Sequence, residues 1–163
     1  MKTKHLVLCG LLTALMLVLG YVESLIPIPS AMPGIKLGLA NSVLLYAVYM
    51  LHLPTAWLLM VLKVLLSALL FGGVNTMLFS LSGGILSMAG MCLLKKTAGV
   101  SPIVVSAAGG MLHNVGQVLM AMLLLKTTGL LGYMAVLMAA GLATGIVTGV
   151  AAKLTMKHLK HLS

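Results

Sequence analysis

The feature that most constrains this chain is a series of long apolar runs separated by short turns. A helix of about 20 apolar residues crosses a membrane hydrocarbon core of about 30 Å, and six such runs fit into the 163 residues. Only 7% of the residues are charged, whereas a soluble domain has roughly a quarter. The runs are continuous rather than alternating, which argues against a β-barrel. The sequence therefore predicts an all-α integral membrane protein.

Proline, glycine and short polar turns set the boundaries of the runs. We expect a single membrane domain over residues 1–163, with a proline- and glycine-rich segment, Pro27–Lys36, after the first run. The first run lacks a small-x-small cleavage site, which favours a retained helix over a signal peptide. The predicted spans are 5–26, 37–51, 55–71, 75–94, 102–125 and 130–152, with a basic tail at 153–163.

The lysines predict the orientation, because cytoplasmic loops carry an excess of basic residues. With six spans both termini share one side, and that side holds seven lysines against two on the other. We therefore expect cytoplasmic termini in a bacterial cytoplasmic membrane. The lysines expected inside are Lys2, Lys4, Lys95, Lys96, Lys153, Lys157 and Lys160, and those expected outside are Lys36 and Lys126.

Lys63 lies near the middle of the third predicted span. A lysine at the centre of a membrane costs about 2.5–3.5 kcal/mol on insertion scales. Both ends of the span are about 12 Å away, too far for the side chain to reach water easily. We expect Lys63 to line a pocket, with Ser67 one turn later on the same helix face; snorkelling is the alternative.

Glu23 is the only acidic residue of the chain and lies in the outer third of the first span. It is the only internal counter-ion available to a lysine, and Lys36 and Lys63 are the candidates. Glu23 is either a solvated acid at a helix end or a pocket acid that pairs with a lysine or with a ligand.

Three hydrogen-bonding side chains, His113, Asn114 and Gln117, lie within about one turn of the fifth span. Such groups need partners in a lipid environment. They form either hydrogen bonds between helices or the polar floor of a binding pocket, to which Asn41 and Asn75 would add amides. One histidine without a second nitrogen, sulfur or carboxylate ligand nearby does not predict a metal site.

Small residues at intervals of four mark two helix faces. Gly141, Gly145 and Gly149 form such a ridge on the sixth span, and Gly10 with Ala14 forms a weaker one on the first. Ridges of this kind allow the backbones of two helices to approach closely. The ridge on the sixth span would pack against another span or bind a second protein.

The lack of a nucleotide-binding motif and of aspartate excludes most catalytic functions. No GxxxxGK[ST] motif is present, and the absence of aspartate removes the paired carboxylates that hold Mg²⁺ on a diphosphate. The sequence therefore predicts no enzyme and no cofactor. The net charge of +9 does not indicate nucleic-acid binding, since the lysines are scattered at span ends rather than gathered on one face.

Three motifs together indicate a family. Glu23–Pro27 (ESLIP), Pro33–Asn41 (PGIKLGLAN) and His113–Gln117 (HNVGQ) resemble the Gx transporter family, also catalogued as heptaprenyl diphosphate synthase component I. The resemblance covers nearly the whole chain, and PGIKLGLAN is its most specific part. The family is similar to the S components of energy-coupling-factor transporters, which implies a six-helix bundle with an outward pocket, a separate coupling membrane protein and two ATPases. It also implies an association with polyprenyl synthases and with flavin-based extracellular electron transfer.

Three functions remain open at this point. The first is an S-component-like carrier that binds an anionic or neutral small molecule, related to a flavin, a vitamin, an isoprenoid or a quinone. The second is an accessory membrane subunit of a prenyl synthase or of an electron-transfer assembly, which would use the basic tail and the sixth-span ridge as docking surfaces. The third is a proton-coupled carrier with Glu23 and His113 as its relay.

Overall fold

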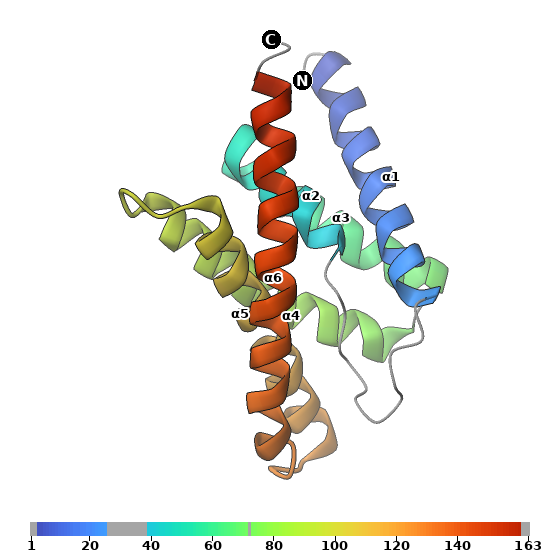
Figure 1. Cartoon of the computed structure of the whole chain (residues 1–163). Helices are drawn as coiled ribbons and strands as arrows, with labels where there is room; N and C mark the ends of the chain where they lie inside the picture. The colour runs from blue at the N-terminus through green and yellow to red at the C-terminus, as the bar shows by residue number, and fades with distance from the viewer. Residues whose placement is uncertain (1–2, 26–38, 72, 161–163) are drawn as a thin grey trace.

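The protein is all-helical in the part of the chain that the structure describes (Figure 1). This structure is a computed structural model, which describes residues 3–25, 39–71 and 73–160, apart from the side chains of residues 23, 24, 39, 159 and 160. Its six helices confirm the predicted fold class. They are α1 (Thr3–Leu25), α2 (Leu39–Met50), α3 (Leu53–Phe71), α4 (Val74–Lys96), α5 (Pro102–Leu125) and α6 (Leu131–Lys160).

Five of these helices are long and apolar enough to cross a membrane. The exception is α2, which has 12 described residues and so extends over only about 18 Å. The described part of the predicted second span at 37–51 is helical over Leu39–Met50, and this part is shorter than a hydrocarbon core of about 30 Å. The molecule is a multi-pass membrane protein with one shorter helix packed among the long ones.

Most of the predicted basic tail at 153–163 is helical, because α6 continues to Lys160. No glycine or proline follows Gly149, and lysine, leucine and methionine favour helices. Ala152 and Met156 are buried on the protein-facing side of this extension. The basic residues therefore sit on an ordered helix, which reaches the same end of the molecule as the start of α1 (Figure 1).

The helices form two groups that share an interface. In one group α5 lies between α4 and α6, and in the other α1, α2 and α3 pack on one another. Contacts of α3 with α4, and of α2 with both α5 and α6, join the groups. The core between them contains fully buried side chains from several helices, which are Met16, Leu45, Val48, Leu59, Met60, Met88 and Val105.

Lys95 ties the end of α4 to the end of α2. Its Nζ donates a hydrogen bond of 2.6 Å to the carbonyl oxygen of Val48 and lies 5.4 Å from the centre of the Tyr49 ring. The last carbonyl groups of a helix lack partners within it and carry partial negative charge. The ammonium group therefore stabilises the C-terminal turn of α2 against α4.

The helix ends of α5 follow from local sequence. Ser101 precedes the helix, its Oγ accepts a hydrogen bond from the backbone N–H of Val104, and Pro102 occupies the first turn. Both are favoured at helix starts because they satisfy or remove unpaired N–H groups. Lys126 ends α5 in a left-handed conformation with φ of 49°, and the following turn brings α6 back alongside α5.

Candidate functional site

A lysine in the interior of an apolar bundle is the starting point of the site. Lys63, near the middle of α3, is half-buried, and its Nζ donates a hydrogen bond of 3.0 Å to Oδ1 of Asn41 in the first turn of α2. A charged group in this environment needs acceptors, since desolvation is expensive. The contact places the positive charge where α2 and α3 meet; Lys63 does not itself line the cavity described next.

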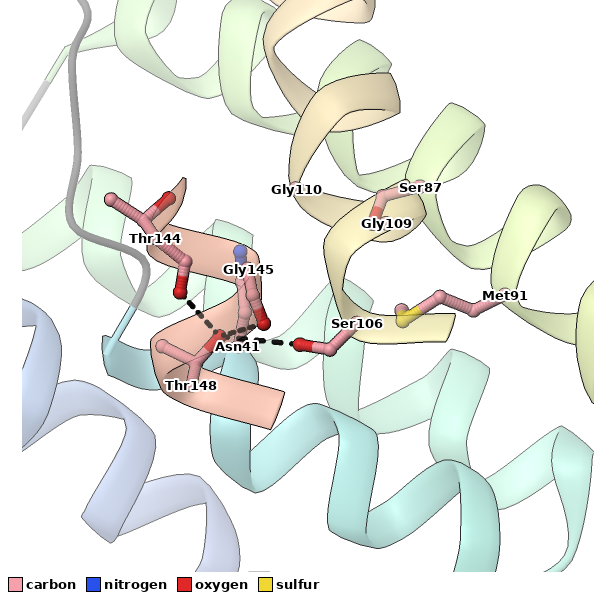
Figure 2. A pocket seen from close by; sticks show the side chains of 9 residues that line it. All are labelled: Asn41, Ser87, Met91, Ser106, Gly109, Gly110, Thr144, Gly145 and Thr148. Carbon is pink, nitrogen blue, oxygen red and sulfur yellow. Dashed lines mark hydrogen bonds between the residues drawn. The ribbon is translucent and has the colours of Figure 1, made fainter. Parts of the chain in front are cut away.

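Asn41 also borders a small polar cavity between α2, α4, α5 and α6 (Figure 2). The cavity has room for roughly one water molecule. A cavity of this size does not hold a vitamin or an isoprenoid. The nine lining residues are Asn41 from α2, Ser87 and Met91 from α4, Ser106, Gly109 and Gly110 from α5, and Thr144, Gly145 and Thr148 from α6.

The hydroxyl groups at the cavity are ordered by hydrogen bonds. Thr148 Oγ1 donates to the carbonyl oxygens of Thr144, at 3.0 Å, and Gly145, at 3.2 Å. Its proton is thereby used, so Ser106 Oγ, which lies 3.2 Å away, donates to Thr148 Oγ1. This bond joins α5 to α6 and leaves the lone pairs of Ser106 Oγ available to the cavity.

Ser87 reaches the cavity from α4. Its side chain is only 4% exposed and borders the cavity, and within residues 3–25, 39–71 and 73–160 its hydroxyl makes no hydrogen bond to protein. A buried hydroxyl of this kind is normally satisfied by protein or by water. The wall of the cavity therefore offers a donor that a small polar guest would satisfy.

The polar residues of α5 do not converge on one chamber. His113 and Gln117 face α4, since a Cβ built on Gly83 would lie 3.0 Å from His113 Cε1 and 2.9 Å from Gln117 Cγ. Asn114 faces the other way, is 4% exposed and donates a hydrogen bond of 2.7 Å from Nδ2 to the carbonyl oxygen of Leu137 on α6. None of the three lines the cavity described above.

The glycine ridge on α6 lies against α5. A Cβ built on Gly145 would lie 2.7 Å from Ala107 Cα, and one on Gly149 would lie 2.9 Å from Ile103 Cα. Gly141 meets the backbone of Gly110 in the same way. The ridge is therefore occupied within the chain and is not a free docking surface for a second protein. By contrast, a Cβ on Gly10 would meet nothing within 4 Å.

The family of heptaprenyl diphosphate synthase component I matches residues 12–155. The chain belongs to this family. No curated protein and no solved structure matches the chain. The family match includes α2 to α5 and most of α1 and α6, and therefore contains Lys63, Asn41 and every residue of the cavity. It ends at residue 155, within the basic extension of α6.

Other predicted site residues of this component I protein lie apart from the cavity. Ser67 is half-buried on α3 one turn after Lys63, and Asn75 is exposed in the first turn of α4. Ala14 is exposed on α1 near Gly10. Glu23 lies in the last turn of α1 with its side chain outside the description, and Lys36 lies outside the described residues altogether.

Sequence reasoning missed the serine and threonine residues of the cavity, which are Ser87, Ser106, Thr144 and Thr148. Such residues are tolerated in membrane helices because the hydroxyl can bond the preceding turn. The available signal was a small polar residue facing a glycine on the next helix, as Ser87 faces Gly109. Among the described residues no group of three or more histidine, cysteine or acidic side chains is close enough to hold a metal ion.

Proposed function

We propose that this member of the component I family is a non-catalytic membrane protein that binds a small molecule with an anionic or neutral polar head group and helps to import it. The hydrogen bond between Lys63 and Asn41 is the observation that supports this most. It places a fixed positive charge and an amide at the junction of α2 and α3. Flavins, vitamins and isoprenoid or quinone derivatives are the candidate ligands.

The charge of the chain favours an anionic or neutral ligand. The chain has ten lysines and a single acidic side chain, and Lys63 brings one of the positive charges into the apolar interior. A cationic ligand would be repelled by the ammonium group in a medium of low dielectric constant, whereas an anion or a carbonyl-rich neutral ligand would be attracted. An anionic or neutral head group therefore fits this junction better than a cation does.

The size of the cavity sets a condition on the proposal. A ligand larger than one water does not fit into the cavity beside Asn41 in the described arrangement, so binding in this cavity would require α2 to move away from α4, α5 and α6. A ligand that replaces Asn41 as the acceptor for Lys63 would offset the cost of that movement. The energy for import would come from separate ATPases, since the chain carries no GxxxxGK[ST] motif.

The test is to identify what the protein carries. The full chain is purified from its native membranes, and the co-eluting small molecules are identified by mass spectrometry. We expect a stoichiometric anionic or neutral ligand with wild type, and its loss with Lys63→Met. Lys126→Met, which removes an exposed lysine from the turn after α5, is the matched control and keeps the ligand.

Two results would contradict the proposal. One is the absence of any stoichiometric ligand together with unchanged melting when flavins, vitamins and isoprenoids are added. The other is equal ligand retention by the Lys63 and Lys126 variants, which would move binding away from the α2–α3 junction.

The name of the family favours a second candidate function. Component I of heptaprenyl diphosphate synthase would assist a soluble catalytic partner, in menaquinone synthesis or next to an electron-transfer assembly, without performing the reaction itself. The chain has no aspartate and cannot form the acidic magnesium sites such a reaction uses. Reconstitution tests this: a soluble prenyl synthase should sediment with vesicles that contain the chain and turn over faster there than with empty vesicles. Equal rates and no sedimentation would exclude the role.

A further inference from the structure

We propose that the basic end of α6, defined as Lys153 and Lys157, is a binding surface for anionic phospholipid head groups. The proposal is independent of the carrier function. It rests on the direction in which these residues point, on their depth relative to a bilayer, and on the charge around them.

The direction comes from the burial pattern of α6. Gly145, Ala152 and Met156 face the other helices and are buried. Lys153 and Lys157 are exposed, and their spacing of four residues puts them on one helix face. In a membrane-spanning helix an exposed side faces lipid, so these ammonium groups point sideways toward lipid and not into the protein.

The same exposed face is apolar one turn earlier. Ile146 is 43% exposed and Val150 is 40% exposed, and both precede Lys153 at helical spacing. The face therefore changes from apolar to basic between Val150 and Lys153. This change is the pattern expected where a helix passes from the hydrocarbon into the head-group layer.

Helix length agrees with that boundary. The part of α6 from Leu131 to Ala152 is about 33 Å long at a rise of about 1.5 Å per residue, which matches a hydrocarbon thickness of about 30 Å. Lys157 lies one turn, about 6 Å, beyond Lys153. Each head-group layer is about 5–8 Å thick, so both lysines fall within it.

The start of α1 lies at this end of the molecule and repeats the pattern (Figure 1). Lys4 is exposed, and the apolar residues that follow it, Val7 and Leu11, are each 65% exposed. The one acidic side chain of the sequence, Glu23, is nineteen residues further along α1 and about 29 Å away. No acidic side chain of the chain competes with lipid phosphates for Lys153 and Lys157.

The experiment compares lipid preference in nanodiscs. The full chain is placed in phosphatidylcholine with and without phosphatidylglycerol, and the lipids that it retains are counted by native mass spectrometry. The variants are Lys153→Gln and Lys157→Gln, singly and together, and the matched control is the charge-keeping pair Lys153→Arg and Lys157→Arg. Melting of each variant verifies that it is folded.

We expect wild type to retain phosphatidylglycerol in preference to phosphatidylcholine. A lysine near an anionic surface contributes about a five-fold preference, so each single glutamine variant should lose about that factor and the pair about twenty-five-fold. The arginine pair should keep the preference, since guanidinium also binds phosphate. Added salt should weaken the preference of wild type.

Two outcomes would overturn the proposal. The glutamine pair could keep the wild-type lipid preference. The arginine pair could lose as much as the glutamine pair, which would assign the effect to packing rather than charge.

Discussion

Lys63 carries a positive charge to the middle of α3, and Asn41 Oδ1 supplies one of its acceptors at 3.0 Å. Hydrogen bonds that involve a charged group contribute more than neutral ones and are costly to leave unmade inside a protein. The stability of the α2–α3 junction should therefore depend on Asn41 more than on an asparagine at the surface.

Asn41→Ala is expected to lower the free energy of unfolding by about 1.5–3 kcal/mol, because a half-buried ammonium group loses an acceptor. The measurement is thermal melting in nanodiscs. Asn75→Ala, which alters the exposed asparagine of α4, is the control and should change stability by no more than about 0.5 kcal/mol. A double-mutant cycle with Lys63→Met should show coupling between the two residues. Equal effects of the two alanine variants would rule out the role assigned to Asn41.

At this scale the sequence identified the unusual residues but not their partners. Lys63 stands out because it is a lone charge in an apolar run. Its pairing with Asn41 joins residues 22 positions apart and depends on how α2 crosses α3. Asn114 was visible as a polar residue, yet whether it faced α4 or α6 depended on a rotation of α5 that no single-helix pattern specifies. Ser87 and Thr148 resemble the many hydroxyl residues that membrane helices tolerate.

The glycine ridge of the sixth span predicted a close helix contact, and the structure has this contact between α5 and α6. Gly145 would place a Cβ 2.7 Å from both Ala107 Cα and the carbonyl oxygen of Ser106. Both of these are backbone atoms, so the neighbour cannot adjust by rotating a side chain. Small residues therefore determine how near α6 lies to α5.

Gly145→Ala is expected to destabilise the protein by about 1–3 kcal/mol, because the added methyl group forces the two backbones apart. Gly10→Ala is the matched control on α1, where a Cβ meets nothing within 4 Å. It should raise stability by about 0.5–1 kcal/mol, since alanine restricts the unfolded chain more than glycine does. Melting of both variants in the same lipid makes the comparison, and similar shifts would refute the close contact.

The sequence predicted each helix and most boundaries because proline, glycine and lysine interrupt the apolar runs. It did not indicate that the helix of the sixth span continues through the basic residues to Lys160. Basic residues end a membrane span without ending a helix, and Met156 is buried well past the expected boundary. A hydropathy pattern reports where lipid ends and not where hydrogen bonding along the backbone ends.

For the whole molecule, the start of α1 and the end of α6 lie at one end, and the turn between α5 and α6 lies at the other (Figure 1). This arrangement is compatible with either orientation in a membrane. The lysine excess favours a cytoplasmic position for the end that carries Lys4 and Lys157.

Cysteine labelling in intact cells measures that orientation. In a background with Cys9→Ala and Cys92→Ala, the exposed sites Lys126→Cys and Lys157→Cys are treated with a membrane-impermeant maleimide. We expect Lys126→Cys to react in intact cells and Lys157→Cys only after the membrane is permeabilised. The reverse pattern would place the termini outside the cell, and reaction of both sites in intact cells would contradict the arrangement of α6 across the membrane.

The glycine contacts described for α5 have a mechanical consequence. Gly116 meets the backbone of α4 and Gly110 meets that of α6, so α4, α5 and α6 cannot slide along one another without first separating. In the proposed import, α4, α5 and α6 would therefore move together as one rigid unit. The α1–α3 group would then be the part that moves. A cross-link between α2 and α6 should therefore stop the proposed import, whereas one between α5 and α6 should not.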